Sequence, residues 1–350
     1  MPRKKVLIIH TGGTLGMKMP GHTRAELAPN IELDRLINRV PELEEIADIE
    51  LISPWNIDSS QVSPNDWQAL AKLISEKGCL GQKDDRGNPK TYAGIVIIHG
   101  TDTMAYTASA LAFMLQNPDR PIVLTGSQRP LEAWRSDARA NLAAAVECAT
   151  MDVKEVMVVF GDSILRGCRS TKADANSYSA FLSPEASPLG EIGTDLEIVW
   201  RRVRNPTMEF GFYPKLEHRV LNLTLFPGFN PKILKQNVEN TDDKELIRAL
   251  IIRGFGVGNI PLQGDLSIFP LIEYLRKKHI PVIMTSQCFR GHTELALYPS
   301  GRQLLDQGVI EARDMTFESV ITKTMWALAH PEMGLQEWFN IDLAGEMTSY

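Results

Sequence analysis

The sequence predicts an α/β protein with mostly parallel sheets, and its length of 350 residues favours two domains over one. Short apolar runs recur along the chain, and small or polar residues follow each of them. Segments with helical periodicity lie between these runs. The region 201–219 is charged, contains Pro206 and Pro214 and lacks a regular period, so it divides this pattern into two halves.

The apolar runs have the length and composition of strands that are buried on both faces of a parallel sheet. In the first half they lie at 6–9, 95–98, 122–124 and 156–160, and in the second half at 221–226, 249–252 and 282–284. A glycine, threonine, serine or proline follows each run within a few residues. We therefore expect a parallel strand at each run.

Four segments between the runs are predicted to be helices. One begins with Ser63 as N-cap and Pro64 at the first helical position, shows helical periodicity, and ends at Gly78. The others are expected at 104–116, stopped near Pro118, at 137–149, capped by Ser136, and at 317–329, capped by Thr316. From the alternation we expect an N-terminal α/β domain at 1–203, a linker at 204–219 and a C-terminal α/β domain at 220–350.

Composition and charge argue against several classes of protein. A formal charge of -6 argues against nucleic-acid binding, because phosphate neutralisation needs a basic surface. No stretch approaches the roughly 20 apolar residues of a membrane span, and residues 6–9 are too few for the core of a signal peptide. The four cysteines form no C-x-x-C pair and the seven histidines are scattered, so we expect no metal site. Free thiols favour a reducing compartment, the cytoplasm.

Ligands of open parallel sheets bind beyond the carboxyl ends of the strands, which directs attention to Thr11-Gly12-Gly13-Thr14. Two glycines let the backbone turn sharply and leave N–H groups free for an anion or oxyanion. A threonine hydroxyl there can attack a carbonyl if a neighbour activates it. The alternative is a simple turn in which the threonine bonds locally. A G-x-G-x-x-G dinucleotide site fails because position 11 is Thr, and no phosphate P-loop, G-x-S-x-G or H-E-x-x-H motif occurs.

Other polar residues follow apolar runs in the same way. They are Asp58, Ser59 and Ser60 after 51–52, Thr101 and Asp102 after 95–98, and Ser127 after 122–124. Lys172 lies beside hydroxyl groups in 169–174 and can pass protons if burial lowers its pKa. Asp102 and Lys172 have structural alternatives: Asp102 can cap the following helix, and Lys172 can be solvated. We expect His10 and His99 to be satisfied interior residues rather than ligands.

Together these motifs resemble the bacterial-type L-asparaginases, and most closely the cytoplasmic type I branch. The matching segments are Thr11-Gly12-Gly13-Thr14-Leu15-Gly16, Asp58-Ser59-Ser60, the run from His99 to Ala110, Leu124-Thr125-Gly126-Ser127-Gln128 and Ser170-Thr171-Lys172-Ala173. Their order and spacing agree, and the likeness covers nearly the whole chain. The resemblance implies a larger N-terminal flavodoxin-like domain, with a mostly parallel sheet and flanking helices, and a smaller C-terminal α/β domain.

The resemblance also implies an activity and roles for particular residues. L-asparagine would be hydrolysed to L-aspartate and ammonia through an acyl-enzyme on Thr14. Thr101, Asp102 and Lys172 would supply charge and proton transfer on the opposite side of the substrate. The α-amino and α-carboxylate groups would be held by Asp58, Ser59 and Ser60, with Thr101 and Asp102 also in contact. No cofactor or metal is implied, and the expected assembly is a homodimer or a homotetramer.

Two features of the resemblance concern residues other than those with the catalytic and substrate-binding roles given above. The family carries a tyrosine in the loop after the nucleophile, whereas residues 17–24 contain none. Either His22 or a shifted residue replaces it, or Thr14 depends on the Thr101–Lys172 group; alternatively, His22 lies on a solvated lid. Thr171, Arg253 and Cys288 resemble an effector pocket of some type I members. The alternative places Arg253 in an ion pair between domains and Cys288 in the core.

Three other functions stay open at this stage. One is a glutaminase-asparaginase, because a pocket separates the two substrates by only about 1–3 kcal/mol for one methylene. A second is a tRNA-dependent amidase subunit; such subunits usually carry an additional N-terminal domain, and here the motif starts at residue 11. A third is a non-catalytic amino-acid sensor, which the missing tyrosine favours and the presence of Thr14, Thr101, Asp102 and Lys172 disfavours.

Overall fold

The computed structural model describes residues 3–17, 36, 38–83, 91–205, 208–242 and 245–348. The chain separates into two compact units, Met1–Pro214 and Lys215–Tyr350, so the division falls within the segment 204–219. Part of that segment belongs to the first unit, because β12 (Gly211–Phe212) pairs with β4 (Leu115–Gln116). Among the described residues, no helix has the length and apolar character that a membrane crossing requires.

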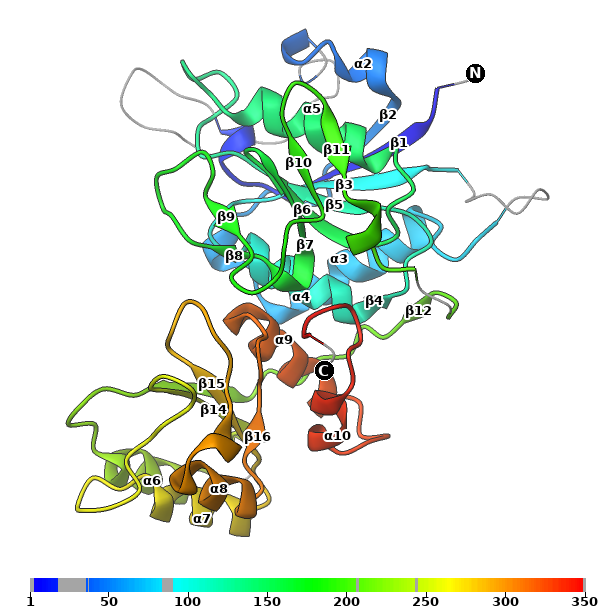
Figure 1. Cartoon of the computed structure of the whole chain (residues 1–350). Coiled ribbons are helices and arrows are strands. Elements are labelled where there is room, and N and C mark those ends of the chain that lie inside the picture. Colours follow the sequence, from blue (N-terminus) through cyan, green and yellow to red (C-terminus); the bar gives the residue numbers. More distant parts are fainter. Residues whose placement is uncertain are drawn as a thin grey trace. The chain divides into compact units, whose positions relative to one another are not determined.

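The first unit is built on an eight-stranded sheet, which confirms the expected fold class (Figure 1). Its parallel strands are β1 (Lys5–His10), β2 (Asp48–Ile52), β3 (Gly94–Ile98), β5 (Ile122–Thr125) and β6 (Val156–Phe160). Their spatial order, β2-β1-β3-β5-β6, is the flavodoxin-like order. Three antiparallel strands that the sequence did not predict extend one edge: β7 (Ser163–Arg166), β10 (Gly190–Ile192) and β11 (Leu196–Ile198).

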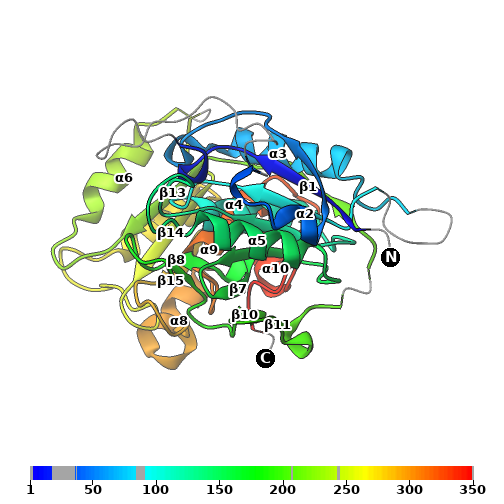
Figure 2. The ribbon, with the colours of Figure 1, turned by 90° about the horizontal axis from the view of Figure 1, so that it is seen from above.

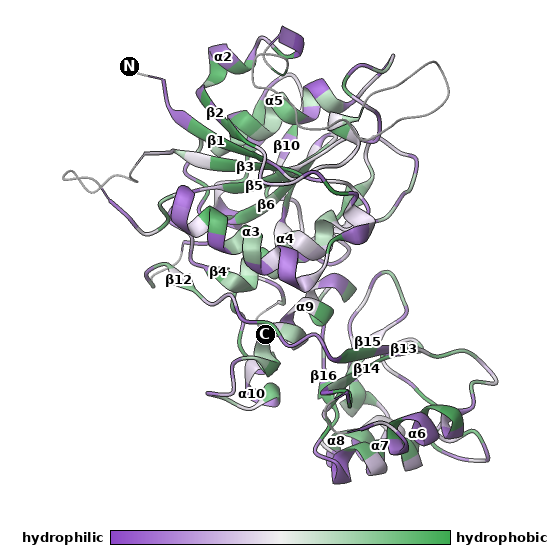
Figure 3. Ribbon diagram, turned by 180° about the vertical axis from the view of Figure 1, so that it is seen from behind, coloured by the Kyte–Doolittle hydropathy of each residue, from purple (hydrophilic) through white to green (hydrophobic). Residues whose placement is uncertain are grey.

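Helices cover both faces of this sheet, which explains why its central strands are apolar throughout. On one face, α2 (Leu43–Ile46) and α5 (Ala138–Ala149) pack over Val6, Ile8 and Val96 (Figure 2). On the other face lie α3 (Pro64–Lys77) and α4 (Met104–Met114) (Figure 1). The hydropathy colouring shows the strands between these helix layers as a continuous apolar band (Figure 3).

Local sequence signals set the starts of two of the predicted helices. The helix α3 begins at Pro64, and the Asp66 carboxylate accepts a hydrogen bond of 2.8 Å from the backbone N–H of Ser63. The helix α9 (Phe317–Leu328) is capped by the Thr316 hydroxyl, which accepts from the Ser319 N–H. The helix predicted at 104–116 is too long, since α4 ends at Met114. Pro118 disfavours helical backbone in the residue before it, and the chain continues as β4.

The second unit contains a four-stranded parallel sheet. Its strands, β13 (Val220–Thr224), β14 (Ala249–Gly254), β15 (Val282–Ser286) and β16 (Ile310–Glu311), stand side by side in chain order. The helices α6 (Pro231–Glu239), α7 (Phe269–Lys277) and α8 (Pro299–Asp306) belong to this unit, as do α9 and α10 (Leu335–Asn340). Ile252 and Met284 face one apolar cluster, and Ile251 and Ile283 face another. Since the order of these described strands never reverses, they form no topological switch point.

Candidate active site

Three loops meet at the carboxyl edge of the first sheet, between β1 and β3. The first is the glycine loop, 11–14, the second is 57–60, and the third is 99–102. The Thr11 N–H donates to the Ile98 carbonyl (3.0 Å), and the Ile57 N–H donates to the Thr11 carbonyl (3.1 Å). A Cβ atom on Gly12 would lie 2.1 Å from the Ile57 oxygen, and one on Gly13 would lie 2.5 Å from the Gly100 nitrogen. Both glycines also have positive φ, 126° and 88°. Side chains at these two positions would therefore force the three loops apart.

Thr14 starts a single 3₁₀ turn, Thr14–Gly16, directly after these glycines. Its side chain is half-buried, and its hydroxyl forms no hydrogen bond with the described residues. The fold therefore places Thr14 at the switch point of the sheet, where ligands of this topology bind. The part of the proposed lid that contains His22 lies outside the described residues.

The second loop carries Asp58, Ser59 and Ser60. The Asp58 carboxylate accepts a 2.8 Å hydrogen bond from the Ser60 N–H, which lowers the pKa of this carboxyl group below its usual value. Ser59 is buried, and its carbonyl accepts from the Thr103 hydroxyl at 2.7 Å. Ser60 is exposed. Asp58 is thus held as an anion beside the glycine loop, which suits recognition of an ammonium group.

The third loop brings Thr101 and Asp102 against Lys172, which lies 70 residues further along the chain on β8 (Thr171–Lys172). The Lys172 ammonium donates to the Thr101 hydroxyl at 2.8 Å and to the Asp102 carboxylate at 2.7 Å. The Lys172 side chain is only 16% exposed, so it is not a solvated surface lysine. Asp102 binds this ammonium, and no described side chain caps the N-terminus of α4.

A series of buried hydrogen bonds supports the loop that carries Thr101 and Asp102. No sequence motif indicated that the residues of this series would contact one another. The Nδ1 atom of His99 lies 2.7 Å from the Gly100 carbonyl, which can only accept, so Nδ1 carries the proton. Its Nε2 then accepts from the Thr107 hydroxyl (3.0 Å), which in turn accepts from the Trp67 indole (2.9 Å). Burial lowers the pKa of His99, so the ring is neutral. His99 is the satisfied interior histidine that the sequence favoured.

His10, at the end of β1, differs from His99. Its side chain is fully buried, and neither ring nitrogen has a hydrogen-bond partner among the described residues. Burial lowers the pKa of His10 to about 4, so the imidazole is neutral near pH 7. His10 is an interior residue as expected, but the expectation that its ring would be satisfied is wrong, since both buried nitrogens lack a partner in the described part of the chain.

Replacing His10 with leucine is expected to stabilise the protein or leave its stability unchanged, since an unsatisfied buried polar group costs about 1–3 kcal/mol. In the unfolded chain the histidine takes up a proton below about pH 6.5, whereas folded His10 stays neutral down to about 4. The free energy of unfolding of the wild type therefore decreases as pH falls between these two values, and the free energy of unfolding of His10→Leu decreases less. Urea unfolding at pH 7 and pH 5 measures both effects; a variant that is destabilised equally at the two values would contradict the prediction.

The three possible effector residues lie in different parts of the chain. Thr171 belongs to the first unit, and Arg253 and Cys288 belong to the second. The Arg253 guanidinium stacks over the Phe317 ring at 4.5 Å from its centroid. Cys288 is exposed, so the alternative of a core position is wrong.

Ser127, which the sequence placed after the strand at 122–124, is buried, and its hydroxyl donates to the Arg129 carbonyl at 2.6 Å.

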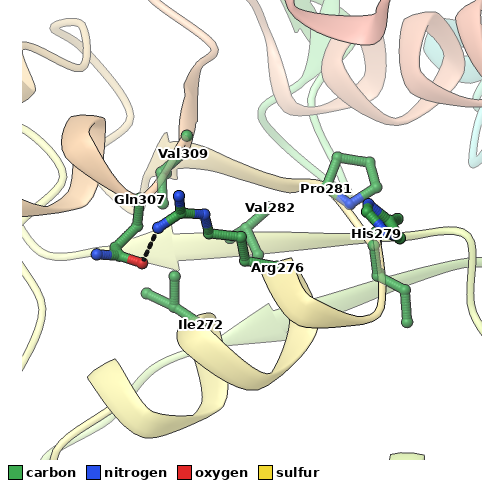
Figure 4. Close-up of a pocket in the computed structure, with 9 residues that line it drawn as sticks. Ile272, Arg276, His279, Pro281, Val282, Gln307 and Val309 are labelled. Atoms are coloured by element: carbon green, nitrogen blue, oxygen red, sulfur yellow. Dashed lines mark hydrogen bonds between the residues drawn. The ribbon is translucent and has the colours of Figure 1, made fainter.

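A cavity of about 340 Å³ lies in the second unit, away from the residues that the sequence singled out. Its floor includes Ile272 and Val282, and Arg276 at its rim donates to the Gln307 side-chain oxygen at 2.9 Å (Figure 4). The cavity lies at the start of β15, which is the amino end of that strand. Ligands of parallel sheets bind at the opposite edge, so this cavity is a less suitable active site than the switch point.

Comparison with known proteins identifies relatives along the whole chain. Residues 5–204 match the family model "Asparaginase, N-terminal", and residues 219–339 match "Glutaminase/Asparaginase C-terminal domain". The chain is 36% identical to an L-asparaginase of Thermococcus kodakarensis, with 98% of this chain and 99% of the relative covered. It is 35% identical to one of the subunits of the glutamyl-tRNA(Gln) amidotransferase of Pyrococcus horikoshii, with 99% of this chain and 77% of the relative covered. The crystal structure of L-asparaginase I from Vibrio cholerae superposes with a TM-score of 0.83 at 32% identity, covering 99% of this chain and 100% of that one.

Proposed function

Because the chain belongs to the asparaginase family, we propose that it hydrolyses L-asparagine to L-aspartate and ammonia through an acyl-enzyme on Thr14. The observation that carries this proposal is the Thr101–Lys172–Asp102 group at the same sheet edge as the glycine loop of Thr14. A hydroxyl that can attack a carbonyl and an amine that can pass protons then flank one site.

Each group of the site has a part in the proposed reaction. The Thr14 oxygen attacks the side-chain amide carbon while its hydroxyl proton passes to solvent water, and backbone N–H groups of the glycine loop stabilise the oxyanion. Thr101 gives a proton to the departing nitrogen and recovers one from the Lys172 ammonium, which solvent water then reprotonates, and ammonia leaves. Water then attacks the ester on Thr14, one of its protons returns to the Thr14 oxygen, and aspartate is released. The ionised Asp58 carboxylate, with Ser59 and Ser60, holds the α-amino and α-carboxylate groups of the substrate.

Three features are part of the proposal through the family resemblance. They are a cytoplasmic location, assembly into a homodimer or homotetramer, and an effector response through Thr171, Arg253 and Cys288. The competing activities are hydrolysis of glutamine at a comparable rate and binding of asparagine without hydrolysis. A single assay distinguishes both competing activities from the proposed activity.

The test is to incubate the purified protein with L-asparagine in the presence of hydroxylamine. We expect ammonia, aspartate and β-aspartohydroxamate, because hydroxylamine competes with water for the acyl group on Thr14. A parallel reaction with L-glutamine gives the preference as a ratio of kcat/KM values.

Each outcome of this assay has a distinct meaning. Ammonia release with aspartate as the sole acyl product at every hydroxylamine concentration would argue for direct attack by water and against the acyl-enzyme. Binding of asparagine without ammonia release would support the sensor. An equal or higher kcat/KM for glutamine would support the broader glutaminase-asparaginase.

A further inference from the structure

Gln128 connects the Thr101–Lys172 group to a loop that the proposed mechanism does not use. The residue follows β5, and its backbone N–H donates to the Asp137 carboxylate at 2.8 Å. Its side-chain nitrogen donates to the carbonyls of Ala175 (3.3 Å) and Ser177 (2.9 Å). Since carbonyls can only accept, these two bonds fix which end of the amide is nitrogen. The Gln128 side-chain oxygen must then face Thr101, 3.4 Å away.

The direction of each hydrogen bond at Thr101 follows from this arrangement. The Lys172 ammonium has only donors, so Thr101 accepts from it at 2.8 Å. The Gln128 oxygen has only acceptor capacity, so the Thr101 proton points toward Gln128. At 3.4 Å this bond is long and weak, so it is easily exchanged for a bond to a substrate. The resting site therefore holds the Thr101 proton on the side away from Lys172.

We propose that Gln128 is a positioning residue that presets the Thr101 hydroxyl as a proton donor toward the substrate's leaving nitrogen. The inference rests on the proposed function, in which Thr101 gives a proton to that nitrogen and recovers one from Lys172. Without an acceptor at position 128, the Thr101 proton has no fixed direction in the described site. The chemical step then slows, whereas binding of the α-amino and α-carboxylate groups at Asp58 is unaffected.

Three variants separate orientation of Thr101 from tethering of the loop 173–180. Gln128→Leu removes both the acceptor for Thr101 and the bonds to the two carbonyls. Gln128→Glu keeps an acceptor oxygen but loses the N–H donors. Tyr178→Phe loosens the same loop elsewhere, because it removes the hydrogen bond from the Tyr178 hydroxyl to the Arg135 carbonyl.

Steady-state ammonia release from L-asparagine, with melting temperatures as a check on folding, gives the result. We expect Gln128→Leu to lower kcat about tenfold with KM within about twofold, and Gln128→Glu and Tyr178→Phe to retain kcat within about threefold. A wild-type rate for Gln128→Leu, or equal losses in Gln128→Leu and Gln128→Glu, would overturn the inference while the proposed function stands. A wild type that releases no ammonia would overturn the proposed function itself.

Discussion

Thr14→Ala is expected to lower kcat for L-asparagine by at least about 10³-fold, because the variant has no hydroxyl with which to form the acyl-enzyme. Binding should survive, since Asp58, Ser59 and Ser60 lie on a different loop. The side chain of Thr14 forms no hydrogen bond with the described residues, so its removal should leave the melting temperature nearly unchanged. Ammonia release and an asparagine-dependent rise in melting temperature measure the two properties separately.

Thr14→Ser is the matched control for this prediction. It keeps a hydroxyl at the same position and removes only the methyl group, so measurable hydrolysis should remain. If Thr14→Ala hydrolysed asparagine at the rate of Thr14→Ser, the nucleophile would be another residue. Thr101 would then be the next candidate, because Lys172 donates to its hydroxyl.

Lys323→Met is expected to destabilise the protein by about 3–5 kcal/mol, the largest stability effect that we predict for a single substitution. Lys323 lies on α9, and its side chain and that of Glu346 are both fully buried. The ammonium donates to the Glu346 carboxylate and to the Ile341 carbonyl (2.7 Å), which fastens the C-terminal segment to α9. Methionine fills similar space but leaves the Glu346 charge buried without its partner.

The pH dependence of this loss follows from Glu346. Burial would raise the pKa of this carboxyl group, but the Lys323 ammonium and hydrogen bonds, including one from the Ala344 N–H, lower it below its usual value. In the wild type this stabilisation is present above about pH 4.5 and is lost as pH falls toward the depressed folded pKa. Without Lys323 the carboxyl group can protonate, so the difference between variant and wild type should shrink between pH 7 and pH 4.

Lys72→Met is the matched control, since it removes the lysine of an exposed ion pair on α3. Lys72 and Glu76 lie 3.9 Å apart, with side chains 65% and 66% exposed. Exposed pairs of this kind contribute little, so this variant should change the free energy of unfolding by no more than about 0.5 kcal/mol. Urea unfolding of both variants gives the comparison. Equal effects in the two would mean that the buried pair adds nothing beyond a surface ion pair.

The pattern of residues along the chain was enough to predict the α/β class, the family and the parallel strands of both units other than β2 and β16, which lie outside the predicted runs. Apolar runs such as 95–98 admit few structures other than a strand covered on both faces, and the helix signals at Ser63 and Thr316 are local. The antiparallel strands β7, β10 and β11 were missed because they are short and only partly apolar, so they lack the long buried run by which the parallel strands were recognised.

Which polar residues meet, and how their hydrogen bonds are directed, depends on the packing of distant segments. Thr101 and Lys172 are far apart in sequence, and their contact depends on the register of β3 against β1 and β5 and on the path of the chain after β7. Gln128 and His99 lie in segments that match the family, but these segments do not show which groups their side chains bind, because the hydrogen bonds of a side-chain amide or imidazole depend on the groups that packing brings to it. Periodicity along the chain reports burial of side chains, whereas the direction of a hydrogen bond requires the positions of atoms from several loops.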